Sequence, residues 1–392
     1  MSFATESGPE NVVTIKVVGV GGAGNNVVNR MVKSGTQGIE YVAVNTDKQA
    51  LAVSSADQKI QIGEKLTHGQ GAGSDPDVGK RSAEESRNNI AKSLENADMV
   101  FITAGMGGGT GTGAAPTIAD IAREAGILTV GVVTKPFKFE GKRRMDQAMV
   151  GINELLGKVD SLLIIPNDRL KFATDQKVTL ANAFEIADDV LRQAVVSISD
   201  LIKNTGFINL DFADVTCVMK DAGFAHMGVG RAAGKGKAED AARMAVASPL
   251  METSINGARG VLINITGSED MGLEDVETAA NLVQEAAHPD ANIIFGASFD
   301  PSLDDEIRVS VIATGFDEPG KAQAEAAPAA AAAPAAAPAA GMYSAAAATA
   351  APAAAPAPAA APAAPAAAPA ADAAAPVEED PFDSIFKIFN SK

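Results

Sequence analysis

A run of seven small residues, Gly107–Gly113, with the sequence GGGTGTG, constrains this chain more than any other segment. The mostly apolar run before it, 98–104, is typical of a buried strand, and from Ala114 to Ala125 apolar residues recur at helical spacing. The run is therefore a glycine-rich loop between a strand and a helix. Backbone N–H groups in such a loop, at the positive end of a helix dipole, can approach an anion closely. With two threonine hydroxyls beside them they predict a polyphosphate site, and the alternative is a mobile turn.

Strands and helices alternate in the first part of the chain. Apolar runs predict strands, and apolar residues spaced three and four apart predict helices. The expected strands are 12–18, 41–44, 98–104, 127–133 and 160–165, and the expected helices are 25–34, 77–95, 114–125 and 143–157. This alternation favours a doubly wound, Rossmann-like α/β domain with a parallel sheet.

A long amphipathic helix is expected at 178–203, where it would span about 37 Å and could join two subdomains. A second set of strands and helices follows it. This set predicts a smaller α/β domain packed on the long helix, and its segments are 214–219, 237–247, 260–267, 272–286, 291–297 and 306–314.

The sequence changes character after about residue 316. Residues 317–376 are overwhelmingly Ala and Pro, so proline interrupts helix and no apolar core can form. We therefore expect a disordered linker there. The expected organisation is a disordered lead at 1–11, a nucleotide-binding domain at 12–177, a central helix at 178–204, a second domain at 205–316, the linker at 317–376 and a C-terminal peptide at 377–392.

Composition excludes several classes of function. The 392-residue chain has a net charge of −17 and no block of Lys or Arg, which argues against a nucleic-acid partner. A single cysteine, Cys217, allows no disulfide within the chain and suits a reducing cytosol. The N-terminus does not resemble a signal peptide, and no run of about 20 apolar residues predicts a membrane span. We expect a cytoplasmic protein that does not insert directly into a membrane.

A second glycine-rich segment, Gly19–Gly24, follows the first expected strand and contains the pattern G-x-G-x-x-G. Alone it predicts a dinucleotide site, with Asp47 placed where a ribose-binding acid would lie. An NAD-dependent oxidoreductase is therefore a real alternative. It leaves Gly107–Gly113 unexplained, because one dinucleotide fold needs one pyrophosphate loop. Two glycine-rich loops at the same sheet edge fit a nucleoside triphosphate better.

A third loop, Gly69–Pro76, precedes the helix expected at 77–95. Asp75 or Ser74 would cap that helix. The glycines Gly71 and Gly73 permit close backbone approach to a γ-phosphate or to magnesium. An ordinary turn is an equally good interpretation of this segment alone.

These loops, within roughly residues 12–316, resemble the successive nucleotide loops of the tubulin/FtsZ family of GTPases. The resemblance implies that GTP or GDP binds to 12–177, with Mg²⁺ held through phosphates and water rather than by protein ligands, and that 205–316 activates hydrolysis. It implies a nucleotide site made of Gly21, Gly22, Ala23, Gly24, Asn25, Asn26, Asp47, Gly71, Ala72, Gly73, Gly107, Gly108, Gly109, Thr110, Gly111, Thr112, Glu140, Arg144, Asn167, Phe184 and Asp188.

Within this implied site, Glu140 and Arg144 would reach the ribose, Asn167 and Asp188 would face the base, and Phe184 would stack on it. A carboxylate can accept from both N1–H and the 2-amino group of guanine, whereas adenine offers neither donor on that edge. Without the resemblance, Asp188 would be interpreted as a solvated helix residue.

The segment Asn209–Asp214 reads by itself as a polar turn with helix caps. The resemblance implies that one subunit inserts this loop into the nucleotide site of the next, where Asp211 and Asp214, assisted by Asn209, orient and polarise the attacking water. Head-to-tail stacking of this kind does not close, so it builds filaments. The family further implies a homopolymer that forms the cytokinetic ring at the bacterial division site, near the inner membrane. A plasmid-segregation GTPase and a non-hydrolysing scaffold remain alternatives.

The C-terminal peptide, 377–392, restores bulky apolar residues after the linker. Phe382, Ile385, Phe386 and Phe389 fall at helical spacing, which predicts a helix-in-groove ligand rather than a frayed tail. It resembles the tail of the family only loosely. The expected partners are membrane-anchoring and regulatory division proteins.

Overall fold

The computed structural model describes residues 13–36, 38–172, 178–179, 182–203, 208, 210–250, 255–268, 270–300 and 303–316. The expected lead at 1–11, the linker at 317–376, the peptide at 377–392 and Asn209 lie outside these residues.

The first half is a parallel sheet with strands in the order β3-β2-β1-β4-β5-β6. The strands are β1 (Ile15–Val20), β2 (Ile39–Asn45), β3 (Gln58–Gln61), β4 (Met99–Gly105), β5 (Leu128–Lys135) and β6 (Ser161–Pro166). Every pairing among them is parallel, and the order is that of a doubly wound dinucleotide-type domain. The fold class expected from the sequence is confirmed.

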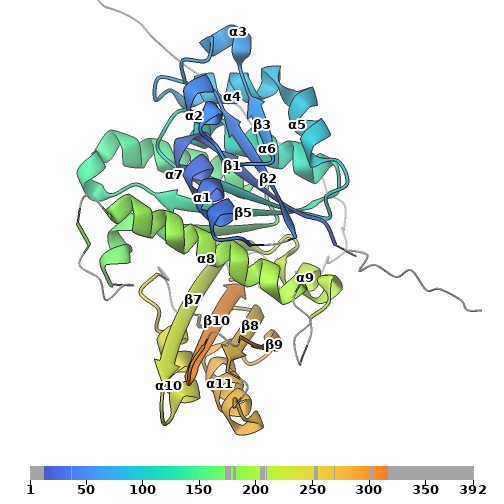
Figure 1. The fold of residues 1–392 in the computed structure, drawn as a ribbon, viewed down its shortest axis with the longest axis vertical. Coiled ribbons are helices and arrows are strands. Elements are labelled where there is room, and N and C mark those ends of the chain that lie inside the picture. The colour runs from blue at the N-terminus through green and yellow to red at the C-terminus, as the bar shows by residue number, and fades with distance from the viewer. Residues whose placement is uncertain are drawn as a thin grey trace, which may run out of the picture. The chain divides into compact units, whose positions relative to one another are not determined.

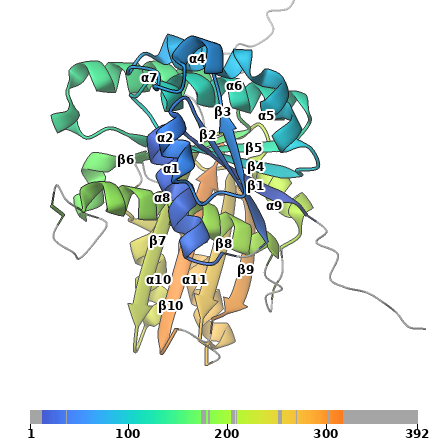
Figure 2. The ribbon, with the colours of Figure 1, turned by 45° about the horizontal axis from the view of Figure 1, so that its top comes forward.

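Helices cover both faces of this sheet (Figures 1 and 2). Because successive side chains of a strand point to opposite faces, Val17 belongs to one apolar core and Val18 to the other. The first core contains the apolar sides of α1 (Gly21–Lys33) and α8 (Ala183–Lys203). The second contains those of α4 (Pro76–Glu85), α5 (Arg87–Leu94), α6 (Thr110–Glu124) and α7 (Lys142–Leu156). Short elements fill the connections: α2 (Lys48–Ala52), α3 (Glu64–Thr67), η1 (Lys138–Glu140) and η2 (Asn167–Phe172).

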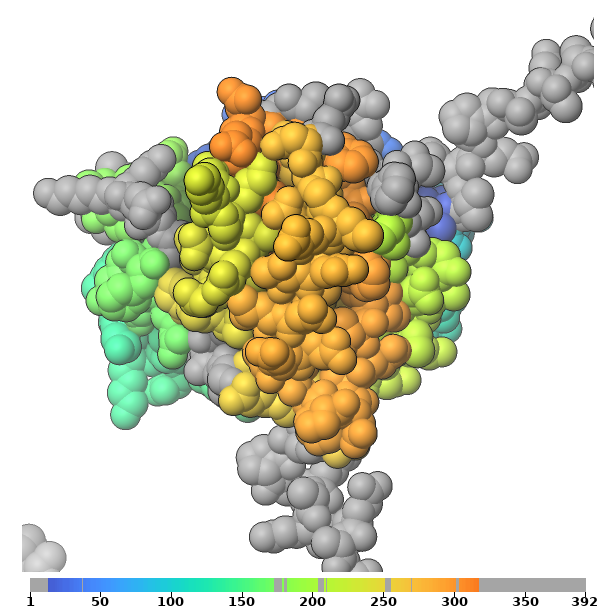
Figure 3. Space-filling view, turned by 90° about the horizontal axis from the view of Figure 1, so that it is seen from below, coloured from blue at the N-terminus to red at the C-terminus, as the bar shows by residue number. Residues whose placement is uncertain are grey.

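The second half continues the same sheet in the order β7-β10-β8-β9, and β7 joins it by a short parallel pairing to β6. Its elements are α9 (Phe212–Met219), β7 (Gly223–Ala233), α10 (Lys237–Val246), β8 (Gly260–Gly267), α11 (Leu273–Ala286), β9 (Asn292–Phe299) and β10 (Glu306–Thr314). Strand β10 is antiparallel to both neighbours, while β8 and β9 are parallel. A third apolar core lies beneath α10 and α11. Figure 3 shows these two helices from below, α10 in yellow and α11 in orange.

Several elements differ from those expected. Helix α6 begins at Thr110 and α1 at Gly21, so both glycine-rich loops are largely first turns of helices. The expected helix at 77–95 is two helices divided at Ser86, whose hydroxyl accepts a hydrogen bond from the N–H of Gly63 at 3.3 Å. Helix α8 begins at Ala183 rather than at 178, because the Asn182 side chain accepts from the Thr179 N–H at 2.7 Å and forms a cap-like turn.

Strands β3 and β7 were not predicted. Strand β7 contains three glycines among its 11 residues, which weakens its sequence pattern. One of them, Gly230, has a packing function, because a Cβ there would lie 1.9 Å from the carbonyl oxygen of Ala241 in α10. Helix and strand therefore pack backbone to backbone at this position.

Candidate functional site

A pocket of about 240 Å³ opens at the carboxyl edge of the parallel sheet. The carboxyl ends of β1, β4 and β5 contribute Val20, Gly105 and Thr134 to its lining. The N-termini of α1 and α6 enter it side by side, since a Cβ on Gly21 would lie only 3.0 Å from the N atom of Gly111. The first N–H groups of a helix have no partner within the helix, and the dipole makes this end positive. Two converging helix N-termini make this part of the pocket an anion site.

The glycines at this edge divide into two kinds. A Cβ on Gly24, Gly109 or Gly113 would lie 1.9 to 2.8 Å from neighbouring atoms, so these glycines allow segments to pack closely. At Gly22 and Gly108, in contrast, no described atom lies within 4 Å of the Cβ position, although both residues line the pocket. The space that their missing side chains leave is open to a ligand, as close approach of a phosphate to the backbone requires.

The pocket lining includes a buried amide oxygen, Asn167 Oδ1, that lacks a partner among the described residues. Asn167, at the start of η2, is 5% exposed, and its Oδ1 has no hydrogen-bond partner among the described residues. A buried polar atom without a partner costs free energy, so most such atoms in proteins are paired. Since Asn167 lines the pocket, a polar ligand would supply the missing bond.

Asp188 of α8 lies in the same part of the pocket and is 8% exposed. Burial raises the pKa of its carboxyl group to about 6; Arg30, whose Nε lies 3.5 Å from Oδ2, opposes this rise, and Glu185 adds to it. At neutral pH the group is an ionised acceptor with one cation at the edge of hydrogen-bonding range. A ligand with two adjacent N–H donors would satisfy it further.

Two further side chains, Glu140 and Phe184, line the pocket. Glu140 of η1 accepts from the Phe137 N–H at 2.8 Å and pairs with Arg144 of α7 at 3.1 Å, so its position is fixed from two sides. Phe184 of α8 is 47% exposed and meets Phe137 edge to face at a ring-centroid distance of 5.5 Å. An exposed aromatic face beside a carboxylate and an amide suits a planar heterocycle. Anion end, linking polar pair and aromatic end together match a nucleotide.

The pocket brings together more than half of the nucleotide-site residues expected from the sequence. They are Gly21, Gly22, Ala23, Gly108, Gly109, Thr110, Gly111, Glu140, Arg144, Asn167, Phe184 and Asp188. The expected residues that do not line it are Gly24, Asn25, Asn26, Asp47, Gly71, Ala72, Gly73, Gly107 and Thr112.

Three of these other residues bind neighbouring protein atoms. With its amide oriented to satisfy both ends, buried Asn25 donates to the carbonyl groups of Gly19 and Gly21 and accepts from Asn45 at 3.1 Å. Asp47 caps α2 by accepting from two backbone N–H groups, at 2.8 and 3.2 Å. Thr112 accepts from the Gly107 N–H at 2.8 Å and so closes the loop at the start of α6. Their side chains shape the edge on which the pocket is built.

The third glycine-rich loop, Gly69–Pro76, is hydrogen-bonded to the same edge of the sheet. The N–H of Gly71 donates to the carbonyl of Thr46 at 3.3 Å, and the Thr46 hydroxyl meets that of Thr110 at 2.7 Å. Asp75 caps α4 through the Asp77 N–H at 2.9 Å, as the sequence predicted. Gly71 and Gly73 have positive φ angles and no described atom within 4 Å of their Cβ positions. The loop can thus approach a ligand that extends beyond Thr110.

Asp211 and Asp214 lie elsewhere. They form a capping box at the start of α9, in which the Asp214 N–H donates to Asp211 Oδ1 at 2.7 Å and the Asp211 N–H to Asp214 Oδ2 at 3.4 Å. Phe212, the first residue of α9, lines a hollow together with Asp98 and Leu128, which lie at the amino ends of β4 and β5. The pocket stands at the carboxyl ends of the same strands, about 20 Å away along β4.

Six residues that line the pocket were not among the site residues expected from the sequence: Val20, Gly105, Met106, Thr134, Pro136 and Ala187. Three of them are the ends or near-ends of parallel strands, and ligands of open α/β sheets bind outside the carboxyl ends of the strands. That rule, applied to each expected strand, would have found Val20, Gly105 and Thr134.

Among the described residues, no group of three or more His, Cys, Asp and Glu side chains is placed to hold a metal ion. None of the helices in the described part of the chain is both long enough and apolar enough to span a bilayer.

Comparison with known proteins gives two family matches. Residues 14–175 match the family described as Tubulin/FtsZ family, GTPase domain, and residues 223–317 match FtsZ family, C-terminal domain.

Solved structures agree with these matches. An FtsZ dimer from M. jannaschii is 45% identical, with 77% of this chain and 88% of that chain covered and a TM-score of 0.74. Two proteins from Haloferax volcanii share the fold at lower identity. GDP-bound CetZ1 is 20% identical, with 80% and 97% covered and a TM-score of 0.66. A CetZ2 protofilament with GTPγS is 21% identical, with 80% and 96% covered and a TM-score of 0.63.

Proposed function

The chain belongs to the tubulin/FtsZ family of GTPases, and from that membership we propose that it hydrolyses GTP only when copies of it assemble head to tail. The observation that carries the proposal is the separation of the pocket from Asp211 and Asp214 across the parallel sheet. One molecule holds the nucleotide at the carboxyl edge and presents two carboxylates at the amino edge.

The phosphates would lie against the N-termini of α1 and α6, with Gly22 and Gly108 leaving the room for them. Backbone N–H groups and helix dipoles then stabilise the negative charge. Magnesium would be held by the phosphates and water, and it would neutralise charge on the β- and γ-phosphates. Gly71, Ala72 and Gly73 lie beside Thr110 and are placed to cover the γ-phosphate side.

The base would lie at the other end, against Phe184. Asp188 would accept from N1–H and the 2-amino group of guanine, and the amide of Asn167, whose Oδ1 has no partner among the described residues, would bond a polar edge of the base. Adenine lacks these donors and would leave a buried carboxylate without them. Leaving a buried charged group unpaired is costly, so this end of the pocket favours guanine. Glu140 and Arg144 stand where the ribose would connect the two ends.

Hydrolysis requires a water positioned for in-line attack on the γ-phosphate, and phosphoryl transfer depends mainly on positioning and charge stabilisation. Asp211 and Asp214, with Asn209, would hold that water from the neighbouring copy. Asp211 is exposed, as a group used between subunits must be. The contact uses two different surfaces, so it repeats without closing and produces a filament. Solved relatives described as a dimer and as a protofilament support self-association.

Loss of the γ-phosphate would remove contacts across this interface, so the filament would turn over. We place this activity in the cytokinetic ring of a dividing bacterium, in the cytoplasm beside the inner membrane. The peptide 377–392 would recruit membrane-anchoring and regulatory division proteins across the linker 317–376.

The test combines sedimentation with phosphate release in the presence of GTP and Mg²⁺. We expect GTP to bring the protein into the pellet and phosphate to appear in proportion to the pelleted protein. ATP should produce neither effect. Sedimentation without phosphate release would contradict hydrolysis, and nicotinamide dinucleotide binding without assembly would favour the oxidoreductase instead.

A further inference from the structure

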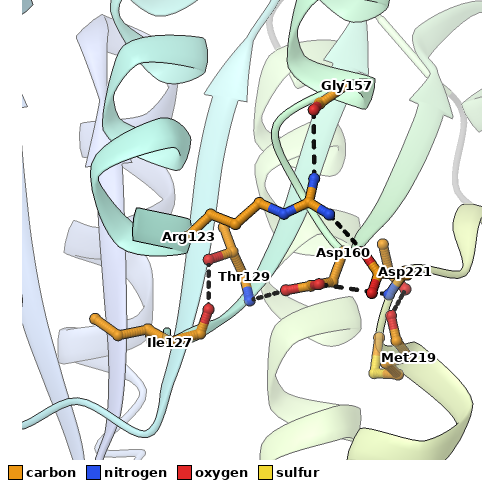
Figure 4. A network of polar contacts seen from close by, with 8 residues as sticks. Arg123, Ile127, Thr129, Gly157, Asp160, Met219 and Asp221 are labelled. Carbon is orange, nitrogen blue, oxygen red and sulfur yellow. Dashed lines mark hydrogen bonds and ion pairs between the residues drawn. The ribbon is translucent and has the colours of Figure 1, made fainter. Parts of the chain in front are cut away.

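A network of polar contacts joins the end of α9 to the amino edge of the parallel sheet (Figure 4). Asp160, just before β6, is 5% exposed. Its carboxylate accepts from the Thr129 N–H at 2.8 Å and from the Asp221 N–H at 3.4 Å. Its own N–H donates to the Thr129 carbonyl at 2.8 Å, and its carbonyl accepts from the Gly223 N–H at 2.9 Å. One residue thus ties β5 to the turn that follows α9.

A second tie comes from the end of α6. Arg123 pairs through Nη2 with Asp221 Oδ1 at 2.5 Å, and its Nη1 donates to the carbonyl of Gly157 at 3.4 Å. Asp221 has a φ angle of 51°, a left-handed conformation that fixes the direction of the turn. The Ser161 hydroxyl adds a third tie by donating to the carbonyl of Met219, the last residue of α9, at 2.6 Å.

These ties act on the element that carries the carboxylates. Helix α9 has only eight residues, about 12 Å, and Asp211 and Asp214 lie at its other end. Its buried apolar residues are Val215, Val218 and Met219, and Phe212 is partly buried. Anchoring the turn after such a short helix therefore restricts where its first turn can lie. A displacement of about 1 Å in a catalytic group is enough to lower a rate 100-fold.

We propose that Arg123, Asp221 and Asp160 are positioning residues for the carboxylates that α9 presents to the neighbouring subunit. This inference rests on the proposed hydrolysis between subunits. Arg123 lies in the last turn of the same helix whose first turn, at Thr110, enters the nucleotide pocket. Helix α6 consequently spans the sheet from the pocket of one subunit to the anchor of the loop that serves the next.

The pair of Arg123 and Asp221 is suited to a test because both side chains are partly exposed, at 44% and 59%. Exposed ion pairs contribute little to stability, so the variants should fold. Asp221→Asn removes the charge, and Asn tolerates the left-handed backbone well. Arg123→Gln removes the cation. The matched control is Arg87→Gln, which breaks the 2.5 Å pair of Arg87 with Glu124, the neighbour of Arg123 on α6.

We expect Arg123→Gln and Asp221→Asn to lower kcat for GTP about tenfold per sedimented subunit. The KM for GTP, the sedimented fraction with a slowly hydrolysed GTP analogue and the melting temperature should stay close to wild type. The double variant should lose no more of its kcat than the less active of the two single variants, because both substitutions break the same contact. Arg123→Lys should recover part of the loss, and Arg87→Gln should behave as wild type.

Wild-type turnover in the Arg123→Gln variant would overturn the inference while leaving the proposed function intact. Loss of sedimentation together with turnover would also overturn it, because the residue would then act on assembly. A wild-type protein that shows no assembly-dependent hydrolysis would instead refute the proposed function, and Asp214→Asn, measured alongside, separates the two cases.

Discussion

The two edges of the parallel sheet are built in different ways. At the carboxyl edge the pocket is preformed: two helix N-termini, two open glycine positions and a buried amide oxygen without a partner among the described residues already converge in one molecule. At the amino edge, Asp211 and Asp214 form a capping box, in which the carboxylate of each residue accepts a hydrogen bond from the backbone N–H of the other. The proposed binding site therefore forms within a single copy, whereas the proposed catalytic carboxylates are arranged as ordinary helix caps.

The largest expected effect concerns the amino edge. Asp214→Asn keeps an oxygen that can accept the Asp211 N–H, so the cap survives, but it removes the charge that would polarise water. We expect GTP turnover to fall about 100- to 1,000-fold with GTP affinity unchanged, measured by phosphate release and by nucleotide binding. An equal fall in affinity would place Asp214 in the binding site and erase the difference between the edges.

The next prediction separates the glycines of the carboxyl edge. In Gly113→Ala the new Cβ would lie 1.9 Å from the carbonyl oxygen of Pro76, so we expect a loss of about 1–3 kcal/mol in the free energy of unfolding. In Gly108→Ala the Cβ meets no described atom within 4 Å, so stability should be retained while GTP affinity falls roughly tenfold. Denaturant unfolding and nucleotide titration measure both. Equal stability losses would show that Gly108 is also a packing glycine.

The difference between the edges also explains how far sequence reasoning reaches. The alternation of strands and helices predicted the doubly wound fold, and the glycine-rich runs after strands predicted the anion end of the pocket, because that end involves only backbone geometry. Asn25 and Asp47 were expected in the site, yet their side chains bond to backbone groups and, for Asn25, to the amide of Asn45. Asn and Asp form such structural bonds as readily as they bind a ligand, so the sequence does not separate the two functions. Strand β7 was missed because glycines such as Gly230 weaken its strand pattern, and Gly230 is needed there for close packing against α10. The positions of Asp211 and Asp214 relative to the pocket depend on tertiary structure and could not be derived from spacing.

A comparable effect on affinity is expected at the base end of the pocket. Asp188→Asn replaces one acceptor by an amide that can donate to a carbonyl at the 2-position, the group that xanthine carries in place of the 2-amino group of guanine. GTP affinity should fall about 10- to 100-fold, and XTP should become the better ligand. Competition titrations with GTP, XTP and ATP measure the exchange. Unchanged preference would remove Asp188 from base recognition.

The smallest effect is a pH dependence. Because the pKa of Asp188 is raised to about 6, its carboxyl group is protonated in the free protein at lower pH, and GTP affinity should fall about tenfold per pH unit below 6. Stability should change in the opposite direction: the folded state binds this proton more tightly than the unfolded chain, so the contribution to folding grows as the pH falls from about 6 toward 3.8.

Asp188→Asn is the control for this titration. The phosphates of GTP ionise in the same way with this variant, but the carboxyl group of Asp188 is absent. Its GTP affinity should show a weaker dependence on pH between 5 and 7 than that of the wild type. The same slope in both proteins would assign the titration to the nucleotide rather than to Asp188.

The most direct test of the split between the two edges is phosphate release per subunit across a protein dilution series at saturating GTP. Nucleotide binding and sedimentation are measured in the same samples. We predict that bound GTP per subunit stays constant while phosphate release per subunit falls toward zero below the concentration at which the protein sediments. Constant release per subunit down to dilutions at which no assembly remains would show that one copy contains the whole hydrolytic site.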